Sequence, residues 1–345
     1  MAENKAFKKL KQDLEKGQLG SVYLFYGEES YLREYYLGAI RKALIPEGME
    51  EFNEHRLSGK GLTVQELFDM VEAMPMMTER TVVEVSDYDL FQLDEEQRSQ
   101  LISVLEDFPP YCCLIFVYDL LEYKPDRKMK KLCAALDAHA EVVKFEAQER
   151  SDLLNWVRRR FKHLGKDIDT HSAEHLLFLC GNLMTGLIPE IEKIAAYTKG
   201  NSITIADIEA VADPVLEAAV FEMTNEVSRG DYDRAALRLS QLLKQQVQPI
   251  MLNAVLGKEL RRLYSARIAL DGGKDKAWLM DLWGMRSDYP AKLLLSAAGK
   301  VSRSWCRDAV KMSQKLDLQM KSQSGFDSEG ELKMFLMRLA QEAKA

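Results

Sequence analysis

The chain has 345 residues, enough for two or three domains, and 47% of them are hydrophobic while 29% are charged. This composition is typical of a globular protein with a sizeable core, and no apolar run is long enough to cross a membrane. The formal net charge of −7 argues against a protein that holds nucleic acid by its own surface alone. We find no secretory signal and therefore expect a cytoplasmic location. The five cysteines contain no CxxC pair, which argues against a disulfide framework or a zinc ribbon, and we expect no cofactor.

The first 146 residues alternate between strand-like and helix-like patterns. The apolar runs that predict strands are SVYLFYG, NEHRLSG, RTVVEVSD, CCLIFVYD and AEVVKFE. The helical patterns between them cover 30–44, about 63–74, about 94–107 and 126–139. Near-continuous apolar strands that alternate with helices predict a parallel sheet covered on both faces.

From about residue 149 onward the pattern is helical, and no further strand is expected. Helices are predicted from the N-cap Ser151 to Gly165, near 170–181 and 186–199, and from the N-cap Thr204 to 212. A break is predicted at Asp213–Pro214, because proline disfavours a helical residue before it. The joints expected in the remaining helical region are Gly230, Pro249, Gly272–Gly273, Pro290 and Ser324–Gly325. The chain is thus α/β plus all-α, with domains at 1–146, 147–213 and 214–345.

The strand, turn and helix at 21–44 have the shape in which many proteins hold a nucleotide phosphate. A working phosphate loop needs glycines, whose amides turn inward, and a lysine that reaches the outer phosphates. The turn here is Gly27-Glu28-Glu29-Ser30, which has one glycine, two carboxylates and no lysine. Since like charges repel, we expect a structural loop without a nucleotide, and we expect Ser30 to cap the helix. The residues expected to pack this helix on the sheet are Tyr31, Leu32, Tyr35 and Tyr36.

Four segments in succession resemble one known family. They are YLFYGEESYLREYYLGAIRKAL, FNEHRLSG, LFDMVEAMPMMTERTVVEV and, near the end, LDLQMKSQSG. The order and spacing of these segments resemble the delta subunit of bacterial DNA polymerase III over the whole chain. The resemblance implies an AAA+-like fold, in which an α/β domain is followed by a small helical lid domain and a helical collar domain.

The resemblance also implies a function. Delta subunits are one arm of the clamp loader, and they bind the ring-shaped sliding clamp (the beta subunit) and open it without hydrolysing ATP. The implied partners are the clamp, the gamma/tau and delta-prime subunits through residues 214–345, and primer–template DNA within the complex. Such a chain is no enzyme by itself, although it is a component of the DNA polymerase III holoenzyme.

The stretch EAMPMMTER, residues 72–80, carries the expected clamp-binding site. Pro75 ends the preceding helix, and Met76 and Met77 follow it between a helix and a strand. By position the two methionines match the pair of bulky apolar residues that the family inserts into a pocket of the clamp. Family members often have leucine and phenylalanine there. The residues alone leave a second interpretation open, in which both methionines pack inward against the following strand.

Other interpretations are weaker. A delta-prime subunit would carry a four-cysteine zinc module and a Ser-Arg-Cys motif, which are missing, and a divergent P-loop ATPase would need a working phosphate loop. His171, His175 and Cys180 have a spacing that can serve zinc, but an ordinary helix explains it better. Three basic clusters, WVRRRFKHLG, KELRRLYSAR and YKPDRKMKK, could touch phosphates, and the sequence does not choose among them.

Overall fold

The computed structural model describes residues 5–342, which form two compact units. The first unit extends to Ala147 and includes Leu183–Thr185, and the second comprises Gln148–Asn182 and the chain from Gly186 onward. A further boundary at residue 213, between a lid and a collar, stays a prediction. Within the described residues, no helix has the length and apolar character that crossing a membrane requires.

The first unit is built on a five-stranded parallel sheet with strand order β2-β3-β4-β1-β5. Its strands are β1 (Val22–Tyr26), β2 (Glu54–Ser58), β3 (Thr81–Ser86), β4 (Cys112–Val117) and β5 (Glu141–Lys144). Its helices are α1 (Lys5–Lys16), α2 (Ser30–Leu44), α3 (Glu50–Asn53), α4 (Val64–Glu72), α5 (Glu95–Glu106) and α6 (Lys130–His139). The predicted parallel sheet and its five strands are therefore confirmed.

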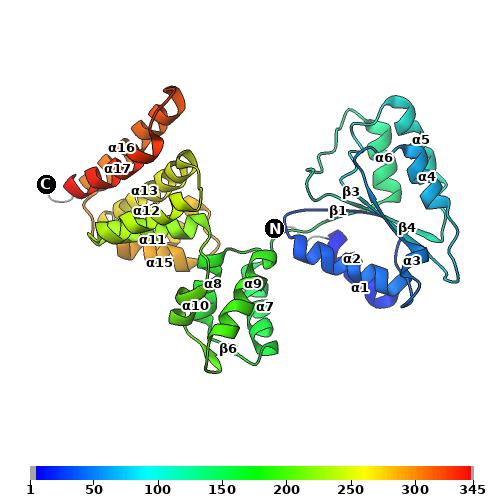
Figure 1. Ribbon diagram of the computed structural model, residues 1–345, viewed down its shortest axis with the longest axis horizontal. Coiled ribbons are helices and arrows are strands. Elements are labelled where there is room, and N and C mark those ends of the chain that lie inside the picture. Colours follow the sequence, from blue (N-terminus) through cyan, green and yellow to red (C-terminus); the bar gives the residue numbers. More distant parts are fainter. Residues whose placement is uncertain (1–4, 343–345) are drawn as a thin grey trace. The chain divides into compact units, whose positions relative to one another are not determined.

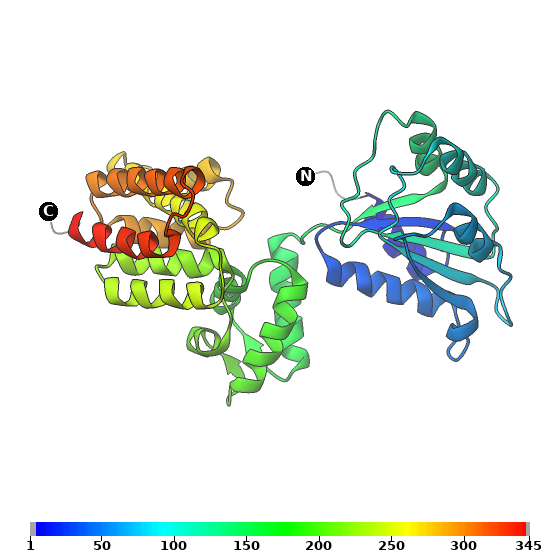
Figure 2. The same ribbon diagram turned by 45° about the horizontal axis from the view of Figure 1, so that its top comes forward.

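Helices cover both faces of this sheet, because alternate strand residues point to opposite sides. Val22 and Leu24 of β1 face a core that Leu67 of α4, Leu101 of α5 and Leu132 of α6 complete. The residues between them, together with α1 and α2, build the core on the other face, which contains Leu10, Tyr23, Phe25, Leu37 and Ile40. The two helical layers are visible on either side of the sheet in Figure 1, and Figure 2 shows them from another direction.

The end of β1 and the end of β5 are joined by a close backbone contact. The N–H of Phe145 donates to the Tyr26 carbonyl at 2.7 Å, and the N–H of Glu29 donates to the Phe145 carbonyl at 3.1 Å. Gly27 lies between these bonds with φ +123°, and a Cβ there would lie 2.2 Å from the Phe145 oxygen. Only glycine fits this position, since any side chain would break the contact.

The second unit is almost entirely helical. Its elements up to residue 211 are α7 (Arg150–His163), β6 (Asp167–Ile168), α8 (Thr170–Cys180), α9 (Met184–Tyr197), β7 (Ser202–Ile203) and α10 (Ile205–Val211). The first two residues of α9, Met184 and Thr185, belong to the first unit. The elements that follow are α11 (Leu216–Ser228), α12 (Tyr232–Lys244), α13 (Pro249–Asp271), α14 (Lys276–Trp283), α15 (Asp288–Ala298), α16 (Arg303–Ser322) and α17 (Ser328–Glu342). Helix α13 packs against α11, α15 and α16, and its Leu252, Leu256, Leu260 and Leu263 lie in their common core.

Several local predictions about the second unit are wrong. Two short strands, β6 and β7, pair in parallel in a region predicted to have no strand. Glu149, not Ser151, is the N-cap of α7, and Pro290 lies inside the first turn of α15 instead of at a joint. The predicted cap at Thr204 is confirmed, because its side chain accepts a hydrogen bond from the Asp207 N–H at 3.2 Å.

We predict that Gly27→Ala lowers the free energy of unfolding by about 2–4 kcal/mol, because the new Cβ clashes with Phe145 and φ is positive. Urea denaturation followed by circular dichroism measures the change. Gly38→Ala is the matched control, since Gly38 lies within α2 and a Cβ there meets no atom within 4 Å. Equal stability of the two variants would contradict this account of the loop.

Candidate functional site

An exposed apolar loop joins α4 to β3. We call residues 73–80 the methionine loop, because Met74, Met76 and Met77 are 78%, 55% and 89% exposed. The interpretation in which Met76 and Met77 pack inward is therefore wrong. Large apolar side chains at this exposure, gathered within four positions, are typical of a surface that binds a partner.

A buried asparagine fixes the backbone of this loop. Asn53, which is 0% exposed, accepts a hydrogen bond from the Met76 N–H at 2.8 Å through Oδ1. Its Nδ2 donates to the Met76 carbonyl at 3.1 Å and to the Met49 carbonyl at 2.9 Å. The side chain of Asn53 thus binds both backbone groups of Met76, as a neighbouring strand would do. It holds the loop while the side chains of Met76 and Met77 stay in solvent.

Further contacts anchor both ends of the methionine loop. Tyr111 donates its hydroxyl to the Glu72 carbonyl at 3.0 Å, where α4 ends. Arg80 donates to the carbonyls of Leu19, Gly20 and Cys112 at 3.0, 2.9 and 3.1 Å. Since these bonds tie the loop to β4 and to the segment before β1, the loop is a fixed feature of the first unit.

Met77 has an unusual backbone conformation at the tip of the loop. Its φ is +59°, in the left-handed region that residues other than glycine rarely adopt. Such a conformation costs on the order of 1–3 kcal/mol and tends to occur at functional sites. Here it accompanies the most exposed of the three methionine side chains, while Pro75 restricts the backbone two residues earlier.

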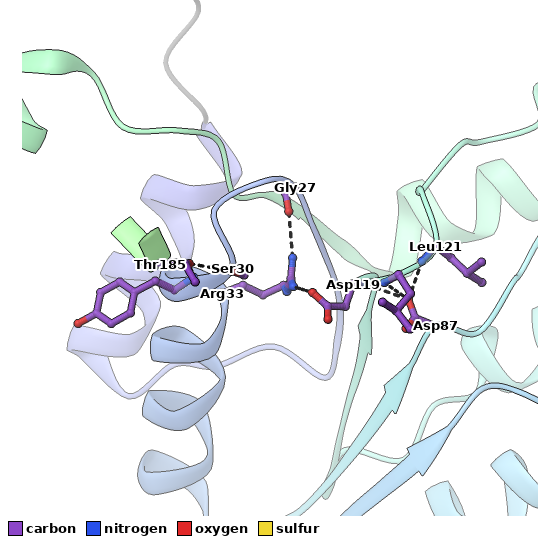
Figure 3. Close-up of polar contacts among 9 residues, drawn as sticks. Gly27, Ser30, Arg33, Asp87, Asp119, Leu121 and Thr185 are labelled. Atoms are coloured by element: carbon purple, nitrogen blue, oxygen red, sulfur yellow. Dashed lines mark hydrogen bonds and ion pairs between the residues drawn. The ribbon is translucent and has the colours of Figure 1, made fainter. Parts of the chain in front are cut away.

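Around the loop Gly27–Ser30, groups that could bind a phosphate already have partners within the protein. Arg33 of α2 is buried and donates from Nη1 to the Gly27 carbonyl at 2.9 Å, and it also pairs with Asp119 (Figure 3). The Glu29 N–H is bound to Phe145, as described above. The cation and the amide nearest to the loop are therefore already bound within the protein.

Glu29 and Ser30 have structural partners as well. Glu29 is the N-cap residue of α2, and its buried carboxylate accepts from the Met184 N–H at 3.0 Å. Burial raises the pKa of this carboxyl, against the effect of the backbone donors. Ser30 is the first residue of α2 and does not cap it, so that prediction is wrong; its hydroxyl lies 2.8 Å from the Thr185 hydroxyl (Figure 3). Tyr36 packs into the core as expected, but Tyr35 is exposed.

Asp87 occupies the place where a nucleotide-binding domain would hold a metal ligand after β3. Its Oδ1 accepts from the N–H groups of Asp119, Leu120 and Leu121 at 2.9, 2.9 and 3.0 Å (Figure 3). With φ +54° it turns the chain after β3, and its carboxylate fixes the segment that follows β4. This carboxylate is therefore a structural anchor.

The histidine cluster on α8 is held by other contacts. His175 Nδ1 lies 2.9 Å from the Tyr289 hydroxyl, and its Nε2 lies 3.3 Å from Glu209. Burial lowers the pKa of this imidazole. Across residues 5–342, no three His, Cys, Asp or Glu side chains gather closely enough to hold a metal ion.

Three contributors to the site were not predicted from the sequence. Met74 lies in the stretch EAMPMMTER but outside the predicted pair, and Asn53 and Tyr111 act on the loop from 23 and 39 positions away. The side-chain roles of Asn53 and Tyr111 depend on the fold and leave no local pattern. Met74 could have been predicted, because it is a third methionine in the same short stretch as Met76 and Met77.

Comparison with known proteins gives one family. The family model described as DNA polymerase III, delta subunit, matches residues 23–146, and a second model, of the C-terminal domain of that subunit, matches 217–339. The DNA polymerase III subunit delta of Bacillus subtilis (strain 168) is 24% identical over 334 residues, which cover 95% of each chain. A probable subunit delta of Aquifex aeolicus (strain VF5) is 22% identical and covers 86% of this chain and 85% of its own.

A solved structure shares the fold. It is the DNA clamp loader delta protein of Bacillus subtilis, which has a TM-score of 0.51 and 23% sequence identity. The match covers 97% of this chain and 99% of that one.

We predict that Asn53→Ala speeds amide hydrogen exchange at Met76 and lowers the free energy of unfolding by about 1–3 kcal/mol, since buried hydrogen bonds are lost. Hydrogen exchange followed by mass spectrometry or NMR measures the first effect. The exposed Asn201, replaced by alanine, is the control. If Met76 exchanged equally slowly in both variants, Asn53 would not be what holds the loop.

Proposed function

Because the chain belongs to the family of DNA polymerase III delta subunits, we propose that it binds the sliding clamp through the methionine loop and opens the ring without hydrolysing ATP. The observation that carries this proposal is the combination of exposed side chains and a fixed backbone at Met76 and Met77. Exposed apolar groups alone are common, but here the buried Asn53 and the hydrogen bonds of Arg80 hold them out into solvent.

The physical chemistry of the loop suits insertion into an apolar pocket. Full burial of one methionine side chain is worth roughly 1.5–3 kcal/mol, so two can form a binding hot spot. A loop that is already ordered loses little backbone entropy on binding, and therefore more of that energy appears as affinity. Methionine also adapts to an irregular pocket, which suits a site where relatives often have leucine and phenylalanine.

Ring opening is the finer part of the proposal. A docked protein favours the open ring only if it binds the open form more tightly than the closed form. Met76 and Met77 supply the attachment, and the rigid sheet behind them can transmit force because β3 begins directly after the loop. The free energy for the cycle then comes from ATP bound to other subunits.

The geometry of the Gly27–Ser30 loop supports the absence of ATP turnover. A phosphate there would face two carboxylates, Glu28 and Glu29, and an arginine already bound to Gly27 and Asp119. Asp87, at the position of a metal ligand, is bound by three backbone amides. These same features argue against the alternative of a divergent P-loop ATPase.

The remaining partners are assigned from the family. We propose that residues 214–345 form a collar that binds the gamma/tau and delta-prime subunits, while residues 147–213 form the lid. Exposed apolar side chains on this part of the chain suit such contacts; they include Leu237, Leu318 and Met337. In this role the chain has no catalytic site of its own and works in the cytoplasm with the replication machinery.

We predict that Met76→Ala combined with Met77→Ala weakens clamp binding about 100-fold or more, since roughly 3–6 kcal/mol of apolar burial is lost. Calorimetry or surface plasmon resonance with the beta clamp of the same organism measures the affinity. The matched control is Met251→Ala with Met337→Ala, two methionines that are 54% and 61% exposed elsewhere. Unchanged clamp affinity in a folded double mutant would remove the docking proposal.

We predict that titration of ATP with Mg²⁺ into the purified chain gives no saturable heat up to ~1 mM nucleotide, the range of weak binding. We expect no binding because Arg33 and the Glu29 N–H, which lie beside Gly27, are already bound within the protein. A single-site isotherm that disappears in a variant of this loop would show instead that the phosphate site still works.

A further inference from the structure

Four unpaired cations lie within five positions, where the segment that follows β4 enters α6. We call Arg127, Lys128, Lys130 and Lys131 the basic turn. All four are exposed, and none forms an ion pair with another described residue. The neighbouring Lys124, by contrast, pairs with Glu122 at 2.6 Å.

The other two basic clusters are partly neutralised. In the cluster on α7, Arg160 lies 3.2 Å from Glu192, and Arg158 donates to the Thr170 hydroxyl. In the cluster on α13, Arg262 pairs with Glu259 at 2.6 Å, and Arg267 pairs with Asp271. The structure thus separates three clusters that look alike in the sequence, because the basic turn keeps all of its charges available.

The backbone of the basic turn is well anchored. The Asp126 carboxylate accepts from the Lys128 N–H at 2.9 Å, and the Asp126 carbonyl accepts from the Met129 N–H at 2.9 Å. Arg98 of α5 donates to the Leu93 carbonyl at 2.8 Å and lies 3.7 Å from the Met129 sulfur. The four cations are therefore displayed from a fixed base beside α5.

Tyr123 fixes the segment that leads into this turn. Its ring centroid lies 4.9 Å from that of Tyr26 and 5.1 Å from that of Tyr118. These contacts attach the segment to the ends of β1 and β4. The long side chains of the basic turn can still move and can adapt to a partner.

The arrangement of charges is unfavourable for the isolated protein. Lys130 and Lys131 begin α6, whose first turn contains no acidic residue. Cations near a helix N-terminus are destabilising by a few tenths of a kcal/mol to about 1 kcal/mol each. The neighbouring helices α4 and α5 carry glutamates in their first turns instead, as helix stability favours. Residues that destabilise the start of α6 in this way indicate a function that needs their positive charge.

We propose that the basic turn contacts the sugar–phosphate backbone of DNA. The inference rests on the proposed role in clamp loading, since that role brings this polyanion to the chain. A hollow of about 300 Å³ beside the turn is lined by Arg98, Lys128, Lys130 and Lys131, with Glu95 as its acidic residue. Lysine and arginine side chains neutralise phosphates whatever the base sequence, so the contact is expected to lie along the backbone of the DNA.

The test compares two variants of the full-length chain that each lose four positive charges. The first replaces Arg127, Lys128, Lys130 and Lys131 by glutamine. The second, the control, replaces the exposed Lys5, Lys16, Lys42 and Lys60 of the same unit by glutamine. Fluorescence anisotropy with a labelled primer–template duplex measures affinity at several salt concentrations, starting from about 50 mM.

In the basic-turn variant we expect DNA affinity to fall about 10-fold or more, and the slope of log affinity against log salt to become shallower by about 2–4. The control should keep the slope of the unaltered chain. Equal slopes in the two variants, or no measurable binding by the unaltered chain at low salt, would overturn the inference.

Clamp affinity, measured on the same proteins, separates this inference from the proposed function. The basic-turn variant should bind the clamp normally, and the Met76→Ala/Met77→Ala variant should bind DNA normally. If the methionine variant keeps its clamp affinity, the docking proposal fails while the DNA result stands. If the basic-turn variant loses clamp affinity and keeps its DNA affinity, the turn is a clamp contact and the DNA inference fails.

Discussion

The hydrogen bonds between Asn53 and the backbone of Met76 are the interaction on which the candidate site depends. Exposing a methionine side chain to solvent brings no favourable free energy, and an unrestrained loop would let that side chain pack back onto the protein. The amide of Asn53 binds both the N–H and the carbonyl of Met76, so the backbone cannot turn inward. Exposure of the methionines is therefore maintained by a buried polar group whose own hydrogen bonds are satisfied.

The first unit also begins with the strand, turn and helix of a phosphate-binding frame. Strand β1, the turn at Gly27 and helix α2 have the expected succession, yet the interactions at the turn are all internal. Arg33 donates to the Gly27 carbonyl, Glu29 lies at the N-cap position of α2 with its carboxylate bound to the Met184 N–H, and the backbone of Phe145 packs directly against Gly27. The frame then serves to place the methionine loop, since both are attached to the same parallel sheet.

The sequence was a good guide to the sheet and a poorer guide to the contacts around it. The five strands were predictable because each is a short apolar run between helical patterns, and burial on both faces leaves little other choice. The strands β6 and β7 contain two residues each, too few for any periodicity. Ser30 and Glu29 contact Thr185 and Met184, which are distant in the sequence, instead of capping α2. The role of Asn53 could not be predicted, because it depends on a contact with Met76 that only the fold creates.

The choice of methionine for the exposed loop has a chemical consequence. Thioethers are oxidised to sulfoxides, which are polar and chiral, and exposure governs how readily this happens. Met74, Met76 and Met77 are open to peroxide, whereas Met184 and Met223 are sealed in the interior. Oxidants would thus add oxygen first to the tip of the loop and leave the cores intact. Leucine and phenylalanine do not undergo this oxidation, so if the loop docks as proposed, a methionine tip makes attachment of the chain sensitive to the redox state of its surroundings.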